Sequence, residues 1–209
     1  MIKENKHSAK SLKPRVIKAS ILLLALAFAG CASPNKDRFY QLSYALHDTV
    51  SVATKYDVIL DSITVPDAIN RPQLVVQKSA TESQILDEQR WISPLDEQIR
   101  QAVQANLQAQ LPQAWLSQRP QVHVELPRYF VHVEVEQLQI SSGQEVAIEM
   151  TWVISDANRK PLRRKQLRRS IALSNGDYAS IAPAISKVLM TLSENIANDI
   201  KDIVQTSEK

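Results

Sequence analysis

The sequence predicts an α/β fold of the mixed α and β kind, in which a single mixed β-sheet with a prominent antiparallel hairpin is layered with two amphipathic helices. Residues 129–140 and 145–155 alternate apolar and polar side chains, which is typical of half-buried strands. Residues 95–111 and 181–203 instead repeat apolar side chains every three or four positions, as helices that cover a sheet do. The length of 209 residues suits one domain with a tail.

The first 30 residues have the features of an export signal. Residues 1–18 are polar and basic, and an apolar run of 11 residues, 19–29, follows. A transmembrane helix needs about 20 apolar residues, whereas the core of a signal peptide needs only about 7 to 15. We therefore predict a lipoprotein signal peptide over 1–30, a lipidated tether over 31–38 and a single periplasmic domain over 39–209.

The lipid anchor is predicted at Cys31, which is the one cysteine of the chain. Small residues just before it resemble the bacterial lipobox, whose cysteine receives a diacylglycerol, although Phe28 stands where leucine is usual. The alternative is an ordinary signal peptide that is cleaved at an Ala-x-Ala site within 25–29. Two or three acyl chains such as palmitate make a stable anchor. An aspartate directly after the cysteine would resemble the signal that retains enterobacterial lipoproteins in the inner membrane. Ala32 stands there instead, which predicts a place on the periplasmic face of the outer membrane.

Three strands are predicted before the first helix. Over 38–44 and 56–64, apolar and polar residues roughly alternate, and β-forming residues are in excess. A third, shorter strand is expected over 73–78. It follows an extended turn that Pro66 and Pro72 set, because proline fixes its own backbone angle φ.

The later elements are delimited by turn and cap residues. Ser93 is the predicted N-cap of the first helix and Pro94 its first residue. After the hairpin we expect a turn at 156–161 and a strand over 167–173. Asp177 then opens the second helix.

Composition excludes several classes of function. The chain has only three glycines, so it has no phosphate-binding loop of the kind that NTP or NAD sites need. Aromatic residues make up 5%, which is too few for a surface on which nucleic-acid bases stack. Residues 31–209 carry 19 Lys and Arg against 21 Asp and Glu, so the mature chain is nearly neutral. We expect no nucleic acid as a partner.

No catalytic or metal-binding constellation is predicted. His47, His123 and His132 do not have the spacing of metal ligands. Glu134 and Glu136 share one face of a strand, which a solvated face of a sheet explains as well as a pair of catalytic carboxylates. The sequence therefore predicts a protein that is not an enzyme and that uses no cofactor and no metal.

Seven basic residues fall within eleven positions, and no acid lies between Asp156 and Asp177. They are Arg159, Lys160, Arg163, Arg164, Lys165, Arg168 and Arg169. One interpretation is a patch for anionic lipid headgroups or an acidic partner. The other is a solvated edge strand, in which positive charge prevents pairing with another chain. Strand alternation points Arg164 and Arg168 to solvent, whereas Arg163, Lys165 and Arg169 are expected where the strand leaves the sheet.

Three stretches together resemble the ABC-type transport auxiliary lipoprotein family. Residues 65–75, V-P-D-A-I-N-R-P-Q-L-V, are similar to the family pattern V-P-[D/E]-x-[L/I]-x-R-P-Q-[I/L]-V, and residues 90–95, R-W-I-S-P-L, are similar to R-W-x-x-P-L. The third stretch, from 177 to 197, is similar to the family's closing helix. The residues that carry the first two matches are Pro66, Asp67, Arg71, Pro72, Arg90 and Trp91. They either shape a turn and the core or contact a partner.

The resemblance implies a non-catalytic auxiliary subunit of an MCE-type intermembrane lipid transport system. Such proteins sit on the inner leaflet of the outer membrane, dock the tunnel of an MCE-domain (PqiB-like) protein there, and support membrane integrity. We expect the same partner here, together with a homo-oligomer of this chain. The alternative is an assembly or scaffolding lipoprotein of another cell-envelope complex.

Overall fold

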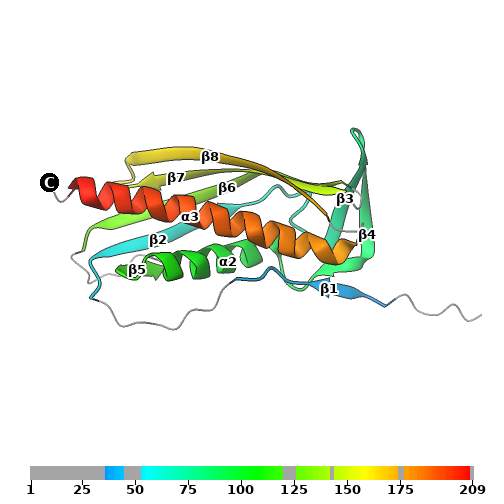
Figure 1. The fold of residues 1–209 in the computed structure, drawn as a ribbon, viewed down its shortest axis with the longest axis horizontal. Helices are drawn as coiled ribbons and strands as arrows, with labels where there is room; N and C mark the ends of the chain where they lie inside the picture. Colours follow the sequence, from blue (N-terminus) through cyan, green and yellow to red (C-terminus); the bar gives the residue numbers. More distant parts are fainter. Residues whose placement is uncertain (1–35, 45–52, 120–125, 142–143, 174–176, 208–209) are drawn as a thin grey trace, which may run out of the picture. The chain divides into compact units, whose positions relative to one another are not determined.

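Two helices, α2 (Leu95–Gln110) and α3 (Ile181–Ser207), pack side by side on one face of a mixed sheet of eight strands (Figure 1). Each helix buries the apolar stripe that its sequence predicts. Ile99, Val103 and Leu107 of α2 and Leu192 and Ile196 of α3 have no solvent exposure. The predicted fold class is therefore confirmed.

The computed structural model describes residues 36–44, 53–119, 126–141, 144–173 and 177–207. The predicted signal peptide, Cys31, His47 and His123 lie outside these ranges. No helix within them is long and apolar enough to cross a membrane. The strands are β1 (Arg38–Tyr40), β2 (Tyr56–Thr64), β3 (Gln73–Ser79), β4 (Glu82–Trp91), β5 (Ala114–Ser117), β6 (Arg128–Ser141), β7 (Glu145–Ser155) and β8 (Pro161–Ala172), and a short 3₁₀ helix, η1 (Tyr178–Ser180), precedes α3.

Strand β6 is the centre of the sheet, because three strands pair with it. On one edge β7 runs antiparallel to it as far as the Ser141–Glu145 pair, and β8 pairs antiparallel with β7. On the other edge β2 pairs in parallel as far as Glu134, and β3 pairs only through Gln77 and Ser141. Beyond these, β5 extends the sheet from β2, and the β3–β4 hairpin carries β1. Residues 135–140 of β6 therefore have no paired strand on this edge among the described residues, because β2 pairs only before them and β3 only after them.

The predicted hairpin is confirmed, but its alternation changes phase. Tyr129, Val131, Val133 and Val135 of β6 face the core, as expected. A β-bulge interrupts the pairing between Val135 and Gln137. Because the extra residue reverses the side of the sheet to which the following side chains point, Leu138 and Ile140 face the core instead.

Two strands lack the alternation that predicts a strand. Half of β4 is exposed, and β5 has only four residues. The first strand ends at Tyr40 rather than at 44, because the backbone N–H groups of Leu42 and Ser43 donate to helix side chains, each at 2.9 Å. The last strand begins at Pro161 rather than at 167, and it pairs with β7 over its whole length.

A buried carboxylate on α3 ties this helix to β7 and β8. Asp199 is 1% exposed. It accepts hydrogen bonds from the indole Nε1 of Trp152 at 3.1 Å and from Nζ of Lys165 at 2.5 Å, and Nε of Arg163 lies 3.8 Å away. The expectation that Arg163, Lys165 and Arg169 lie where the strand leaves the sheet is therefore wrong, because the strand is longer than predicted and contains all three. Arg163 and Lys165 face the helix.

We predict that Asp199→Ala lowers the free energy of unfolding by about 1–3 kcal/mol, since it leaves the buried indole N–H of Trp152 without an acceptor. The two cations are half exposed and return to water at little cost. Urea denaturation checks this, with Asp202→Ala as a matched control on the exposed side of the same helix. An equal loss in both variants would contradict the role assigned to Asp199.

Candidate functional site

The two sequence motifs that resemble a family lie against each other at the start of α2. Pro66 opens the loop between β2 and β3, and its carbonyl oxygen accepts the N–H groups of Ile69 and Asn70, both at 3.0 Å. At the other end of the loop, the carbonyl oxygen of Pro72 accepts the N–H of Trp91 at 2.7 Å. The loop between the strands is therefore fixed at both ends.

The loop also supplies the cap of α2. The prediction of Ser93 as the N-cap is wrong. Pro94 occupies the N-cap position, and no side-chain hydrogen bond caps the helix there. Instead the side-chain oxygen of Asn70 accepts the N–H of Asp96 at 3.3 Å. Ser93 serves through its backbone carbonyl, which accepts from the side chain of the buried Gln98 at 2.8 Å. A cap that comes from 26 residues away leaves no local signal in the sequence.

The motif residues divide into two groups by exposure and contact. Trp91 is 4% exposed and belongs to the core, and the two prolines shape the loop. Asp67 is exposed, and Nε of Arg90 donates to the carbonyl oxygen of Asp87 at 2.7 Å. These contacts favour a structural role for most of the motif. Arg71 differs, because it borders a cavity.

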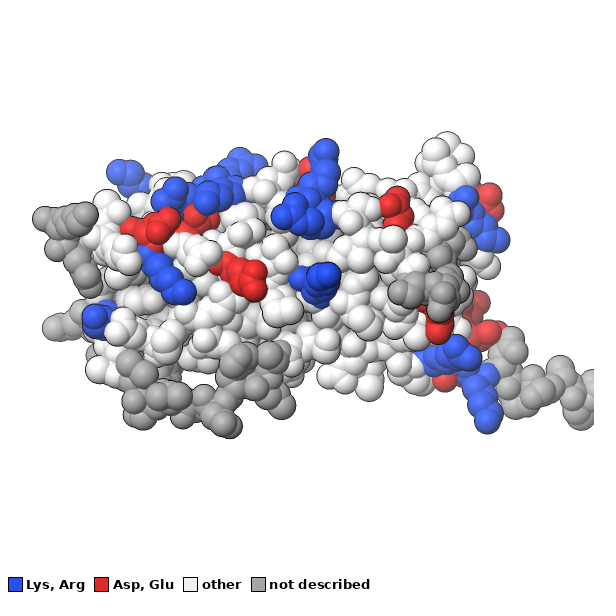
Figure 2. All heavy atoms as spheres, viewed as in Figure 1, with Lys and Arg blue, Asp and Glu red and all other residues white. Residues whose placement is uncertain are grey.

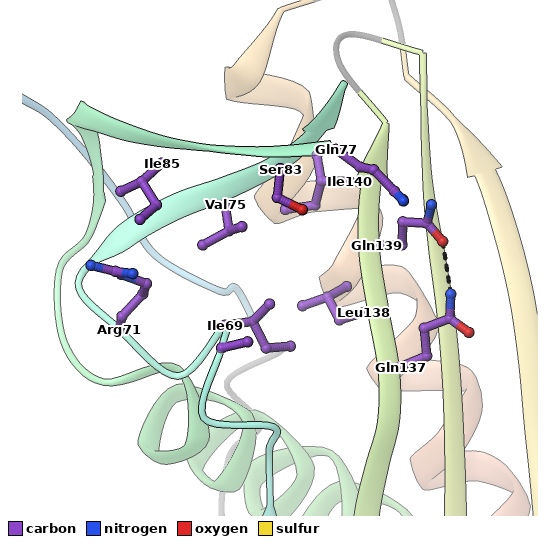
Figure 3. A pocket seen from close by; sticks show the side chains of 11 residues that line it. Ile69, Arg71, Val75, Gln77, Ser83, Ile85, Gln137, Leu138, Gln139 and Ile140 are labelled. Atoms are coloured by element: carbon purple, nitrogen blue, oxygen red, sulfur yellow. Dashed lines mark hydrogen bonds between the residues drawn. The ribbon is translucent and has the colours of Figure 1, made fainter. Parts of the chain in front are cut away.

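This cavity, which we call the β3–β6 wedge, opens where β3 diverges from β6 (Figure 3). Its volume is about 440 Å³, within the usual range of ligand sites, roughly 300–1,000 Å³. It is lined by residues 137–140 of β6 together with Ala68, Ile69, Arg71, Val75, Gln77, Ser83 and Ile85. Two of these, Ser83 and Ile85, belong to β4, which the sequence does not predict.

The wedge has an apolar middle and polar margins. Ile69 from the loop and Leu138 from β6 approach each other across its middle, and Arg71 lies on the opposite side from Gln137 and Gln139 (Figure 3). The guanidinium of Arg71 donates to the side chain of Gln73 at 3.4 Å and forms no ion pair with any described carboxylate. The side-chain oxygen of Gln77 is buried and has no hydrogen-bond partner.

The basic stretch is more neutralised than its sequence suggests. Arg159 has a left-handed backbone (φ 65°), stacks 3.6 Å from the ring centre of Phe130 and pairs with Asp61. Arg168 forms two hydrogen bonds with Glu149, at 2.7 and 2.8 Å, which hold the pKa of that carboxyl below its usual value. On the face that Figure 2 shows, acidic and basic side chains likewise lie next to one another.

Two cations of β8 remain without a carboxylate partner among the described residues. Arg164 is exposed and forms no hydrogen bond or ion pair with the described residues, whereas Arg169 donates to the backbone carbonyl oxygen of Arg168 at 3.1 Å. The prediction that Arg164 and Arg168 point to solvent is confirmed by their exposure.

The candidate catalytic residues are bound into ordinary polar contacts. His132 shares a hydrogen bond with the hydroxyl of Ser62. Glu136 accepts hydrogen bonds from Thr151 and from Gln166, the latter at 3.0 Å. Within the part of the chain that the structure describes, no group of three or more His, Cys, Asp or Glu side chains is placed to hold a metal ion.

Comparison with known proteins now decides the family. The sequence model of the family described as "ABC-type transport auxiliary lipoprotein component" matches residues 40–197. This chain belongs to that family. The match covers both motifs and most of α3, so the resemblance drawn from them is confirmed.

Curated relatives are similar to this chain in sequence, and two solved structures are similar to it in fold. The intermembrane transport lipoprotein PqiC of Escherichia coli K12 is 26% identical over 184 residues, which cover 87% of this chain and 96% of PqiC, and PqiC of Shigella flexneri matches equally. A crystal structure of an uncharacterised protein is similar in fold, with a TM-score of 0.64, 21% identity and coverage of 79% of this chain and 99% of its own. A crystal structure from Xanthomonas campestris has a TM-score of 0.62, 16% identity and coverage of 82% and 100%.

We predict that Asn70→Ala lowers the free energy of unfolding by about 1 kcal/mol, because an N–H group at the start of α2 loses its acceptor. Asn70→Asp is expected to retain most of the stability, since a carboxylate also accepts this bond and is favoured at a helix N-terminus. Urea denaturation of both variants measures the difference. Equal losses would mean that the contact with Asp96 does not stabilise the loop.

Proposed function

We propose that this chain is an outer-membrane lipoprotein that serves as a non-catalytic auxiliary subunit of an MCE-type intermembrane lipid transport system. The family match over residues 40–197 carries the proposal. The name of the relative PqiC, an intermembrane transport lipoprotein, and the lipobox before Cys31 support it. In this role the chain docks the periplasmic tunnel to the outer membrane and supports membrane integrity.

In this proposal the lipid anchor fixes the distance of the domain from the membrane. A diacylglycerol on Cys31 holds the chain in the inner leaflet of the outer membrane. Seven residues separate Cys31 from Phe39, and at about 3.5 Å each they reach at most about 25 Å. The domain therefore stays close to the bilayer, where a protein that crosses the periplasm would meet it.

Contact surfaces rather than a reactive site suit this role. Asp67 is exposed on the loop, Arg71 and Arg90 are half-buried there and at the end of β4, and the exposed cations of β8 lie on a strand whose outer edge has no partner among the described strands. We propose that the β8 cations contact anionic headgroups or an acidic rim of the partner. A homo-oligomer of this chain would repeat these surfaces around one tunnel.

Affinity purification of the tagged full chain from its native envelope tests the proposal. We expect recovery of an MCE-domain tunnel protein, an outer-membrane location, and an intact mass that shows acylation of Cys31. Cys31→Ser is the matched control, because it removes the acyl chains and leaves the domain unchanged. Recovery of a different envelope complex without an MCE protein would instead support an assembly or scaffolding role, and an unmodified Cys31 would contradict the anchor.

A charge reversal at Arg164 tests the basic edge, because Arg164 is exposed and forms no ion pair with a described carboxylate. An exposed cation near an anionic surface contributes about 1 kcal/mol, and salt screens it. In the Cys31→Ser background, Arg164→Glu is expected to reduce sedimentation with phosphatidylglycerol vesicles at low salt but not at high salt. The control Lys201→Glu reverses an exposed charge on α3. Equal binding by both variants would mean that the stretch is only a protected edge.

A further inference from the structure

The wedge borders a strand edge that has no partner among the described strands. β2 leaves β6 after Glu134, and β3 reaches it only at Ser141. Residues 135–140 lie between, and six residues at a rise of about 3.3 Å span about 20 Å. Alternate residues of this stretch direct their main-chain N–H and C=O groups away from β7 and towards the wedge. Such a row of groups is a template for an added strand.

The side chains around the edge lack interaction partners that one ligand could supply together. The buried oxygen of Gln77 requires a hydrogen-bond donor, and Gln137 and Gln139 present amide groups beside it. Arg71 has no carboxylate partner among the described residues, so a negatively charged group of a ligand would form an ion pair with it. Between these polar margins, the half-buried Ile69 lies beside Leu138, a core residue that is 8% exposed (Figure 3).

We propose that the β3–β6 wedge binds an extended, acidic segment of a protein partner, which adds as a strand to the edge of β6. The segment donates an N–H to Gln77, places an apolar side chain against Ile69 and Leu138, and brings a carboxylate to Arg71. A phospholipid has a negative group for Arg71, but it has no row of alternating donors and acceptors for a strand edge. The inference rests on the proposed function, because the segment would belong to the transport partner.

Peptide selection tests this without the partner. A phage-displayed library of random dodecapeptides is selected on the purified full chain in detergent and depleted on Ala68→Trp, whose indole fills the mouth of the wedge. We expect peptides that alternate apolar and polar residues and carry an aspartate or glutamate. Failure to enrich any peptide over the Ala68→Trp protein would overturn the proposal.

Synthetic versions of the selected peptides then define how they bind. We expect the affinity for the peptides to fall about tenfold or more in both Arg71→Gln and Ala68→Trp. Arg71→Gln removes the charged contact, and Ala68→Trp removes the space for the added strand. The controls Lys201→Gln and Ala157→Trp change exposed residues away from the wedge and should bind as the wild type does. Methylation of the peptide nitrogens on one edge of the strand should abolish binding, whereas methylation on the other edge should not.

Two outcomes separate this inference from its alternatives. If phosphatidylglycerol vesicles bind the wild type but not Ala68→Trp, and no peptide does, the wedge is a lipid site and the proposal is wrong. If peptides bind as described while no MCE protein co-purifies with the chain, the wedge inference stands and the proposed function fails. Circular dichroism checks whether Ala68→Trp and Arg71→Gln remain folded.

Discussion

The two helices cover one face of the sheet, and the apolar side chains of the long strands β6 and β7 face them (Figure 1). Each long strand must therefore alternate apolar and polar side chains, and each helix must present one apolar stripe. Asp199 shows how strict this requirement is, because a carboxylate that is 1% exposed on the helix side is held by Trp152, Lys165 and Arg163. Removing its hydrogen bonds would leave polar groups where only apolar packing is stable.

The wedge is a consequence of the same sheet. β6 has 14 residues, whereas β2 pairs with it only as far as Glu134, so the second half of its edge needs another neighbour. The β3–β4 hairpin approaches that half but touches it only at Ser141, because the loop that begins at Pro66 holds the start of β3 against α2. The motif that identifies the family thus shapes the cavity and supplies Arg71 to its margin.

Charge in the basic stretch is mostly neutralised locally. Arg159, Arg163, Lys165 and Arg168 each meet a carboxylate from another strand or from α3. A count of basic residues along the chain therefore overstates the surface that an anionic partner would meet. Arg164 and Arg71 matter more, because neither has an ion pair among the described residues, and Arg164 lies on β8 whereas Arg71 lies in the loop before β3.

The sequence by itself determined the fold class, the hairpin, both helices and the family, because periodicity and motif residues are local properties of the chain. It also placed Arg164 and Arg168 in solvent from strand alternation alone. Only the tertiary structure decided that β4 and β5 exist, and that Arg163 and Lys165 pair with Asp199. It also decided that the side chain of Asn70, rather than that of Ser93, accepts an N–H group at the start of α2. The wedge also escaped prediction, since it joins residues from β3, β4, β6 and a loop. These features depend on contacts between distant segments, which no local pattern of the chain records.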